Sequence, residues 1–388
     1  MRGRILLIAD NFYPSKLPPE SRINTLLAMS LVKRGWAVAV WGGLEATAPL
    51  QGEGIQVARQ AKNWGILEIG KLIVWIAWYK PDRIGLMYFG SFYSNKAHIN
   101  IVPLIAKWLR IPCYTLFTNG RIPHRAFYQD VIVRFWGLRQ LAQPKVGLLG
   151  ASSKLVFYCQ KDRIRLLKPL AKKFSSTVVP PPSLLPQAPL GVRERRSNNF
   201  ALGYFGLIYP GKGLEWILDA LHLVRSSGMS ATLLAVGADG AVTSEKDFAE
   251  RCKAYRLQLA TRARALGIEE FITWTGYKDD SQVSELLVHC DALCLPFDDG
   301  LSGRRSSFIE CAKLGRPVIT TLANGTDCFL RGPHSGILFV PPKDPERIAA
   351  EISRLISDPP FRDECGARLK KFALQAFDNE KFVDCFDS

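Results

Sequence analysis

Histidine is scarce in this sequence, and its cysteines form none of the patterns that build metal or disulfide sites. The chain has five histidines, none grouped at metal-ligand spacing, and nine cysteines, an odd number with no Cys-x-x-Cys pair. Zinc sites and disulfide frameworks both require such groupings. We therefore expect no metal site, and we expect cysteines that stay reduced, as in the cytoplasm.

Long hydrophobic runs are also absent. The first apolar run, Ile5–Ala9, ends at Asp10 and is too short for the core of a secretory signal. The most apolar segment, Ile66–Tyr79, contains Glu68 and Lys71 and falls short of the roughly 20 residues that span a bilayer. We expect Ile66–Tyr79 to form a buried helix, and a surface that touches a membrane is the alternative.

The sequence lacks a glycine-rich motif of the dinucleotide-binding type. The turn that follows the first apolar run, Asp10–Glu20, contains three prolines and no Gly-x-Gly-x-x-Gly pattern. That pattern brings the start of a helix close to a dinucleotide. A nicotinamide site therefore has little support. We expect the protein to use no cofactor.

Positive charge is abundant, and it is confined to one half of the chain. The net charge is +16, and residues 1–182 hold 26 Lys and Arg against 8 Asp and Glu, so residues 183–388 are slightly acidic. A one-sided basic domain predicts an anionic partner: membrane headgroups, an anionic glycan or lipid-phosphate acceptor, or a nucleic acid. The basic residues are dispersed and no nucleic-acid-binding motif accompanies them. We therefore expect no nucleic-acid partner, and a cytoplasmic protein for which an anionic membrane surface is one candidate partner.

Apolar runs and helical periodicities alternate along the sequence, which indicates an α/β fold with parallel sheets. The expected strands are Ile5–Ala9, Ala37–Trp41, Ile84–Tyr88, Cys113–Phe117, Val146–Leu149, Phe200–Phe205 and Thr232–Val236. The expected helices between them include Ser21–Arg34, Ile101–Leu109 and Leu214–Val224. A last helical stretch covers Pro360–Phe382.

A change of composition divides the chain into domains. Residues 178–199 read VVPPPSLLPQAPLGVRERRSNN, a proline-rich and then charged stretch that cannot hold a regular element. At 388 residues the chain is long enough for two domains. We expect two doubly wound, Rossmann-like domains with a cleft between them, over residues 1–182 and 200–370. Residues 183–199 would form the linker, and residues 371–388 a C-terminal helix.

The most informative segment is residues 291–321, DALCLPFDDGLSGRRSSFIECAKLGRPVITT. An apolar strand is followed by a polar loop, a helix and a second strand. Arg304, Arg305, Ser306 and Ser307 stand where the helix begins, with the serines at the expected N-cap. Free amide groups at a helix start, guanidinium groups and hydroxyls together suit a phosphate or diphosphate. We expect an anion there, and a surface loop with solvated arginines is the alternative.

This segment resembles the donor-binding region of retaining GT-B glycosyltransferases of family 4, the glycosyl transferases group 1. Residues 206–221, GLIYPGKGLEWILDAL, are similar to the family's lysine motif, in which Lys212 matches the diphosphate lysine. DALCLPF, GRPVITT and Ser335–Asp358 then follow in the family's order. The resemblance implies a GT-B architecture in which the second domain binds a nucleotide-sugar. It also implies that the C-terminal helix packs back on the first domain.

The resemblance assigns roles to single residues. Lys212 and Arg304 would stabilise the donor diphosphate, and Glu310 would bind the ribose. The other donor-binding positions would be Gly206, Gly211, Ser302, Gly303, Arg305, Ser306 and Ser307. Because cations and a helix start can stabilise a leaving diphosphate without a metal ion, we expect a metal-independent reaction.

One carboxylate of the family pattern is missing. The family usually has a second glutamate eight residues before the one that Glu310 matches, and this chain has Ser302 there. Asp299, or its neighbour Asp298, is the candidate replacement that would meet the donor sugar. Metal binding by this pair is an alternative for which the sequence offers little support.

The acceptor side is less defined. A family histidine usually follows a segment like Pro112–Phe117, but Asn119 stands in that region and can only hydrogen-bond a sugar hydroxyl. Ligands also gather at the carboxyl edge of a first strand. The candidates at that edge are Asn11, Tyr13, Lys16 and Arg22, and an ordinary polar loop is the alternative.

The resemblance implies a retaining glycosyltransferase of the hexosyl type. It would move a sugar from a nucleotide-diphosphate sugar to a glycan or lipid-linked acceptor, in cell-surface polysaccharide or glycolipid synthesis. The missing glutamate and histidine leave two alternatives open. One is a non-catalytic partner or binding protein of the same fold, and the other is a nucleotide-sugar epimerase.

Overall fold

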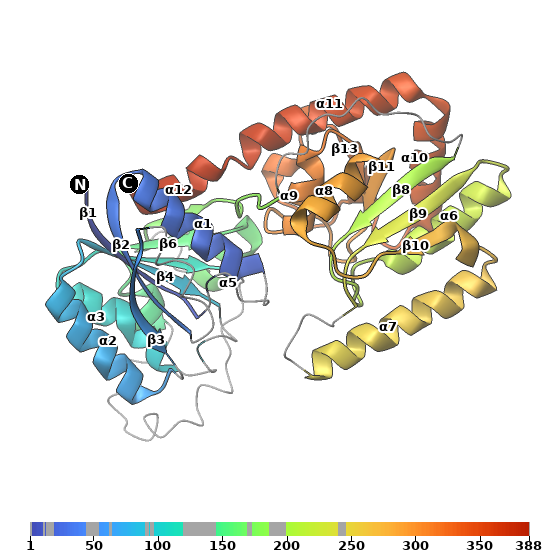
Figure 1. Ribbon diagram of the computed structural model, residues 1–388. Coiled ribbons are helices and arrows are strands. Elements are labelled where there is room, and N and C mark those ends of the chain that lie inside the picture. The colour runs from blue at the N-terminus through green and yellow to red at the C-terminus, as the bar shows by residue number, and fades with distance from the viewer. Residues whose placement is uncertain are drawn as a thin grey trace. The chain divides into compact units, whose positions relative to one another are not determined.

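The computed structural model in Figure 1 consists of two compact units. It describes residues 2–10, 12, 19–43, 54–61, 64–89, 93, 97–118, 145–168, 173–185, 199–239 and 246–387. Unit 1 comprises Met1–Pro181 and Asn379–Ser388, and unit 2 comprises Pro182–Asp378. Each unit is an α/β structure on its own parallel sheet, so the predicted fold class is confirmed.

The described strands of unit 1 pair in the order β3-β2-β1-β4-β5-β6-β7. Successive strands run to one side from β1 and then to the other side from β4, which is the pattern of a doubly wound sheet. The bounds are β1 Gly3–Ile8, β2 Trp36–Gly43, β3 Gln56–Ala61, β4 Arg83–Tyr88, β5 Cys113–Phe117, β6 Lys154–Phe157 and β7 Ser176–Val178.

Helices cover both faces of this sheet (Figure 1). Side chains of α2 and α3 share one core with Leu6 and Ile8. On the opposite face α1 lies beside α12, and Phe386 of α12 packs near Leu7, where Gly85 leaves room for both. The bounds are α1 Pro19–Lys33, α2 Ile66–Tyr79, η3 Ala97–Ile101, α3 Val102–Trp108, η6 Lys145–Leu149, α5 Gln160–Leu167 and α12 Asn379–Asp387.

One strand predicted for unit 1 is wrong. Val146–Leu149 lies in the π-helical turn η6, and the sheet is continued by β6 eight residues later. A run of four apolar residues fits a buried helix as well as a strand, and Gly147 weakens a strand. The hydroxyl of Ser152 donates to the carbonyl of Leu148, which closes the helical turn.

The last helical stretch, predicted as Pro360–Phe382, is two helices. α11 spans Pro359–Ala376 in unit 2, and α12 belongs to unit 1. Between them Phe377 has φ −115° and ψ 44°, outside the helical range. Its ring is buried against three other phenylalanines, Phe308, Phe329 and Phe372. The burial of this ring explains why the chain leaves the helix here.

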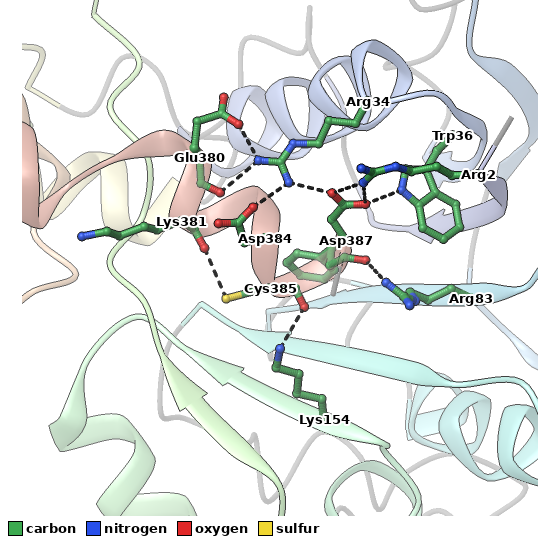
Figure 2. Close-up of polar contacts among 11 residues, drawn as sticks. Arg2, Arg34, Trp36, Arg83, Lys154, Glu380, Lys381, Asp384, Cys385 and Asp387 are labelled. Carbon is green, nitrogen blue, oxygen red and sulfur yellow. Dashed lines mark hydrogen bonds and ion pairs between the residues drawn. The ribbon is translucent and has the colours of Figure 1, made fainter.

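Charged contacts attach α12 to the rest of unit 1 (Figure 2). Arg34 pairs with Asp384 at 2.7 Å and with Asp387 at 2.9 Å. Arg2 also pairs with Asp387, at 2.6 Å, and the indole nitrogen of Trp36 donates to the same carboxylate at 2.7 Å. We call this group the α12 cluster, which consists of Arg2, Arg34, Trp36, Glu380, Asp384 and Asp387.

Unit 2 has strands in the order β10-β9-β8-β11-β12-β13. Their bounds are β8 Phe200–Phe205, β9 Ala231–Val236, β10 Ile272–Trp274, β11 Ala292–Leu295, β12 Val318–Thr321 and β13 Ile337–Val340. The main helices are α6 Leu214–Ser226, α7 Lys246–Ala265, α8 Asp280–Val288, α9 Ser306–Lys313, α10 Pro345–Ser357 and α11. Short 3-10 turns cover Glu269–Phe271, Cys328–Leu330 and Pro333–Ser335.

Candidate functional site

Two loops of unit 2 meet at the start of α9. One follows β8 and holds residues 206–213, and the other follows β11 and holds residues 296–305. The amide of Asp298 donates to the carbonyl of Gly211 at 3.2 Å, which joins the loops. β8 and β11 are neighbouring parallel strands, and the carboxyl ends of such strands are where open α/β sheets bind ligands.

Three glycines allow the loops to approach this closely. Gly213 has φ +76°, and a Cβ atom there would lie 2.0 Å from the carbonyl oxygen of Pro296. A Cβ atom at Gly237, after β9, would lie 1.8 Å from the carbonyl oxygen of Gly206. Gly206 in turn faces Ser307 of α9. A Cβ atom at Gly206 would lie 3.6 Å from the Cβ atom of Ser307. A larger residue at Gly213 or Gly237 would push the loops apart.

Lys212 brings a buried cation into this site. Its side chain is 8% exposed, and its ammonium lies 5.2 Å from the ring centre of Phe297. Burial and the nearby charges of Arg305 and Arg304 lower the pKa of Lys212 to about 7, although Asp299 acts in the opposite direction. Within the described residues Lys212 forms no ion pair. No carboxylate of the described residues therefore pairs with the amino group of Lys212.

Arg305 lies beside the same aromatic ring. Its guanidinium carbon is 4.3 Å from the ring centre of Phe297, and its Nη2 pairs with Asp299. Its Nε is buried and has no hydrogen-bond partner among the described residues. Because a buried N–H group without an acceptor costs free energy, this nitrogen is a suitable donor to an anionic ligand. Arg304 is half-buried at the same turn.

The adjacent carboxylates Asp298 and Asp299 have protein partners. Asp298 accepts a hydrogen bond from the indole of Trp216 at 2.9 Å and lies 3.9 Å from the ammonium of Lys343. Asp299 pairs with Arg305. In the described ranges no group of three or more metal-ligating side chains occurs. These contacts shape the loop and fix the position of a site arginine.

The start of α9 differs from the prediction. The N-cap is Arg305, with φ −75° and ψ 90°, and neither Ser306 nor Ser307 caps the helix. The two serines are the first and second helical residues because the loop keeps its extended conformation through Arg305. The side chain of Arg305 makes no capping hydrogen bond. The first amide groups of a helix have no intrahelical acceptor, so Ser306 and Ser307 present N–H groups at this end.

Glu310 is buried and already has three donors. Its carboxylate accepts hydrogen bonds from the hydroxyl of Ser183 at 2.6 Å, the amide of Leu184 at 2.5 Å and the amide of Leu185 at 3.2 Å. Burial raises the pKa of Glu310, and these hydrogen bonds oppose that shift. Glu310 therefore anchors the segment that enters unit 2. A ribose contact by Glu310 stays a prediction.

A second buried carboxylate supports the loop. Asp327 accepts a hydrogen bond from the amide of Gly303 at 2.7 Å and is 4% exposed. Ser302 beside it is also buried, at 7% exposure. The sequence analysis missed Asp327, although it follows β12 at the carboxyl edge of the sheet. That position was the signal that could have revealed it.

The acceptor-side predictions are largely outside the described part of the chain. Asn11, Tyr13, Lys16 and Asn119 lie outside the described residues. Arg22 is described, and it lies half-buried on α1. Of the donor-side predictions, the structure brings together Lys212, Asp299, Arg304, Arg305, Gly206, Gly211, Ser306 and Ser307 around the two loops and the start of α9.

A family comparison covers the same region. Residues 199–358 match the family model described as glycosyl transferases group 1. This range contains both loops and α9. No curated protein is similar enough in sequence to count as a relative.

Solved structures of similar fold extend over the whole chain. Anabaena Alr3699/HepE, crystallised with UDP and glucose, is 18% identical, and 98% of this chain and 97% of that one align with a TM-score of 0.67. A glycosyltransferase from Rickettsia africae is 15% identical over 98% and 96%, with a TM-score of 0.71. WaaG, involved in lipopolysaccharide biosynthesis, is 15% identical over 98% and 99%, with a TM-score of 0.62. The chain therefore has the GT-B fold, and its residues 199–358 form a domain of the glycosyl transferases group 1 family.

Proposed function

We propose that this protein is a retaining glycosyltransferase that moves a sugar from a nucleotide-diphosphate sugar to a glycan or lipid-linked acceptor. The observation that carries the proposal is the buried cation Lys212, held beside Arg304 and Arg305 at the start of α9. When a glycosidic bond to a diphosphate breaks, negative charge grows on the leaving diphosphate. Preorganised cations and helix amides stabilise that charge most effectively where water is excluded.

The roles of the site residues follow from this chemistry. Lys212 and Arg304 bind the diphosphate, together with the amides of Ser306 and Ser307. Arg305 donates its Nε, and Asp299 keeps its guanidinium in place. Glu310 contributes to the nucleotide site through its last acceptor position, in addition to anchoring residues 183–185.

A hexosyl donor is the first to test. HepE was crystallised with UDP-glucose as well as with UDP and glucose, which makes uridine diphosphate sugars the natural starting panel. WaaG and WaaB are both named as enzymes of lipopolysaccharide synthesis, so glycan and lipid-linked acceptors belong in the same panel. In this proposal the reaction needs no divalent metal, because protein cations neutralise the leaving group.

The test is a transfer assay with the full chain, in EDTA and in magnesium or manganese. Nucleotide-sugars are first screened by thermal shift, since a ligand that binds the folded state raises the melting temperature. We expect transfer with retained anomeric configuration and equal rates in EDTA and metal. Activity that disappears in EDTA and returns with metal would contradict metal independence. Binding without hydrolysis or transfer would instead support a non-catalytic partner, and release of a C2-inverted sugar without acceptor would support an epimerase.

A further inference from the structure

Helix α2 of unit 1 is apolar on two sides. Four side chains of its inner face are buried in unit 1: Ile69, Leu72, Ile76 and Tyr79. Its outer face is apolar as well, because Leu67, Val74 and Trp78 are 79%, 70% and 71% exposed. A helix that covers a sheet normally turns polar residues outward. Packing among the described residues of unit 1 therefore does not account for the outer face.

Helix α3 extends this exposed apolar surface. It contacts α2 and contributes to the same core, so both helices cover the same face of the sheet (Figure 1). Its last residue, Trp108, is 81% exposed, and Lys107 beside it is exposed too. Side chains that point away from the sheet on either helix emerge on the same side of unit 1. We call this the α2–α3 surface, which consists of Leu67, Lys71, Val74, Trp78, Lys107 and Trp108.

The charge of the α2–α3 surface has one sign. Its charged residues are two lysines, and the exposed charged residues that follow the ends of α2 and α3 are Lys80, Asp82 and Arg110. The single acidic residue of α2, Glu68, is 7% exposed and pairs with Arg59 at 2.9 Å, and α3 has no acidic residue. The surface therefore combines exposed aromatic and aliphatic groups with cations and no exposed carboxylate from either helix.

We propose that the α2–α3 surface docks on a bilayer that contains anionic lipids. Leu67, Val74, Trp78 and Trp108 enter the interfacial layer, and the lysines contact headgroup phosphates. Tryptophan and lysine both suit that layer, because each has an apolar body and a polar end. In the described parts of the chain no helix is long and apolar enough to cross a membrane, so the contact is peripheral.

Charge favours a bilayer over a second copy of the chain. A symmetric dimer through this surface would bring the same patch of both copies together. The lysines of one copy would then meet those of the other without a carboxylate from either helix to neutralise them. An anionic bilayer supplies the missing negative charge and an apolar layer at the same time.

The first experiment measures binding of the full chain to vesicles. Phosphatidylcholine vesicles with and without phosphatidylglycerol are compared, at low and high salt. We expect binding only with the anionic lipid, and weaker binding at high salt because ions screen exposed charges. The double variant V74S/W78S should bind at least about tenfold more weakly, since apolar burial contributes to interfacial binding. The matched control Leu257→Ser, at a position 70% exposed on α7 of unit 2, should bind within about twofold of wild type.

A second pair of variants tests the cationic part. Lys71→Glu should weaken binding by about fivefold or more, because each basic residue near an anionic surface contributes that much. Lys253→Glu, at an exposed lysine of α7, should leave binding unchanged. Lipids brominated near the headgroup should quench tryptophan emission of the bound protein, and Trp108→Phe should reduce the quenched fraction. A surface that only supports folding would not produce that quenching.

Three results would overturn the proposal. Vesicle binding that does not depend on lipid charge would contradict the proposal. Equal weakening of binding by V74S/W78S and Leu257→Ser would contradict it too, because the effect would not be specific to the α2–α3 surface. Self-association without vesicles that V74S/W78S abolishes would assign the surface to a second copy. The inference goes beyond the proposed function and can fail independently of it, because vesicle binding requires no nucleotide-sugar. Loss of docking with intact nucleotide binding would leave the proposed function standing.

Discussion

The α12 cluster and the site in unit 2 both contain basic side chains, and the two places differ in what faces the positive charge. In the α12 cluster, two arginines face three carboxylates that come from one helix (Figure 2). At the site in unit 2, Lys212 is buried near Arg304 and Arg305, Asp299 pairs with Arg305, and Lys212 forms no ion pair among the described residues. The first place pairs its arginines with carboxylates, whereas the second keeps a buried lysine without such a partner.

The pKa values of both places are lowered, but the two shifts have opposite effects on the charged form. Burial alone would raise the pKa of Asp387, but hydrogen bonds from Trp36, Arg2 and Arg34 outweigh it and bring the pKa to about 2. At the other site, burial brings the pKa of Lys212 down to about 7. The first environment favours the charged form and the second disfavours it. The comparison supports the proposal of an anion site in unit 2 and favours a structural role for the α12 cluster.

The largest expected effect is on nucleotide binding at the unit 2 site. Lys212→Met should lower the affinity for a nucleotide diphosphate by at least about 1.5 kcal/mol, because it removes a charge-assisted contact. It should not lower the free energy of unfolding, since the unligated protein gains little from a buried, unneutralised ammonium. Calorimetry with UDP checks the first expectation, and Lys253→Met on α7 is the control. Unchanged affinity for UDP in Lys212→Met would contradict the expected role of Lys212 in ligand binding, and the unit 2 site would then not differ from the α12 cluster in this respect.

The second largest effect concerns the α12 cluster, where we expect a loss of stability and no change in nucleotide binding. Arg34→Met should lower the free energy of unfolding by about 1 kcal/mol, because a network of partly exposed ion pairs loses its central arginine. The affinity for UDP should stay the same. Urea denaturation of the full chain measures the stability, and the matched control is Arg264→Met, which removes one exposed pair with Glu269. A loss of UDP affinity in Arg34→Met would show that the cluster does more than hold α12.

The smallest expected effect is on acid stability. The pKa of Asp387 is about 2 in the folded protein and near 3.9 in an unfolded chain. Its charged form therefore stabilises the fold above about pH 4, and this contribution is lost as the pH falls toward 2. The stability difference between wild type and Asp387→Asn should accordingly shrink between pH 5 and pH 2. A difference that stays constant over that range would mean that the carboxylate charge is not what holds α12.

Much of the fold could be predicted from the sequence because its signals are local. The apolar runs of β5 and β8 gave the correct bounds, and the helical spacing of α6 gave the correct start at Leu214. Val146–Leu149 failed because four apolar residues carry too little periodicity to separate a strand from a helix. The break at Phe377 was missed because it depends on the burial of this ring against phenylalanines that include Phe308. Neighbouring residues in the sequence do not predict such a contact.

The site could be predicted only in part, for the same physical reason. Lys212 and the arginine pair lie in motifs whose order along the chain is visible. The contact of Glu310 with Ser183 spans 127 positions, and that of Asp327 with Gly303 depends on how two loops fold. The N-cap of α9 is Arg305 and not one of the predicted serines, because the loop conformation, and not residue preference, determines where the helix begins.

If Lys212 binds an anionic ligand, ligand binding should be accompanied by proton uptake. At pH 8, with a pKa of about 7, Lys212 is mostly neutral in the free protein. A bound diphosphate should restore its charge, so UDP binding should take up close to one proton. Calorimetry in buffers of different ionisation enthalpy measures this number. We predict uptake in wild type and none in Lys212→Met, whereas equal uptake in both proteins, or none in wild type, would contradict the account.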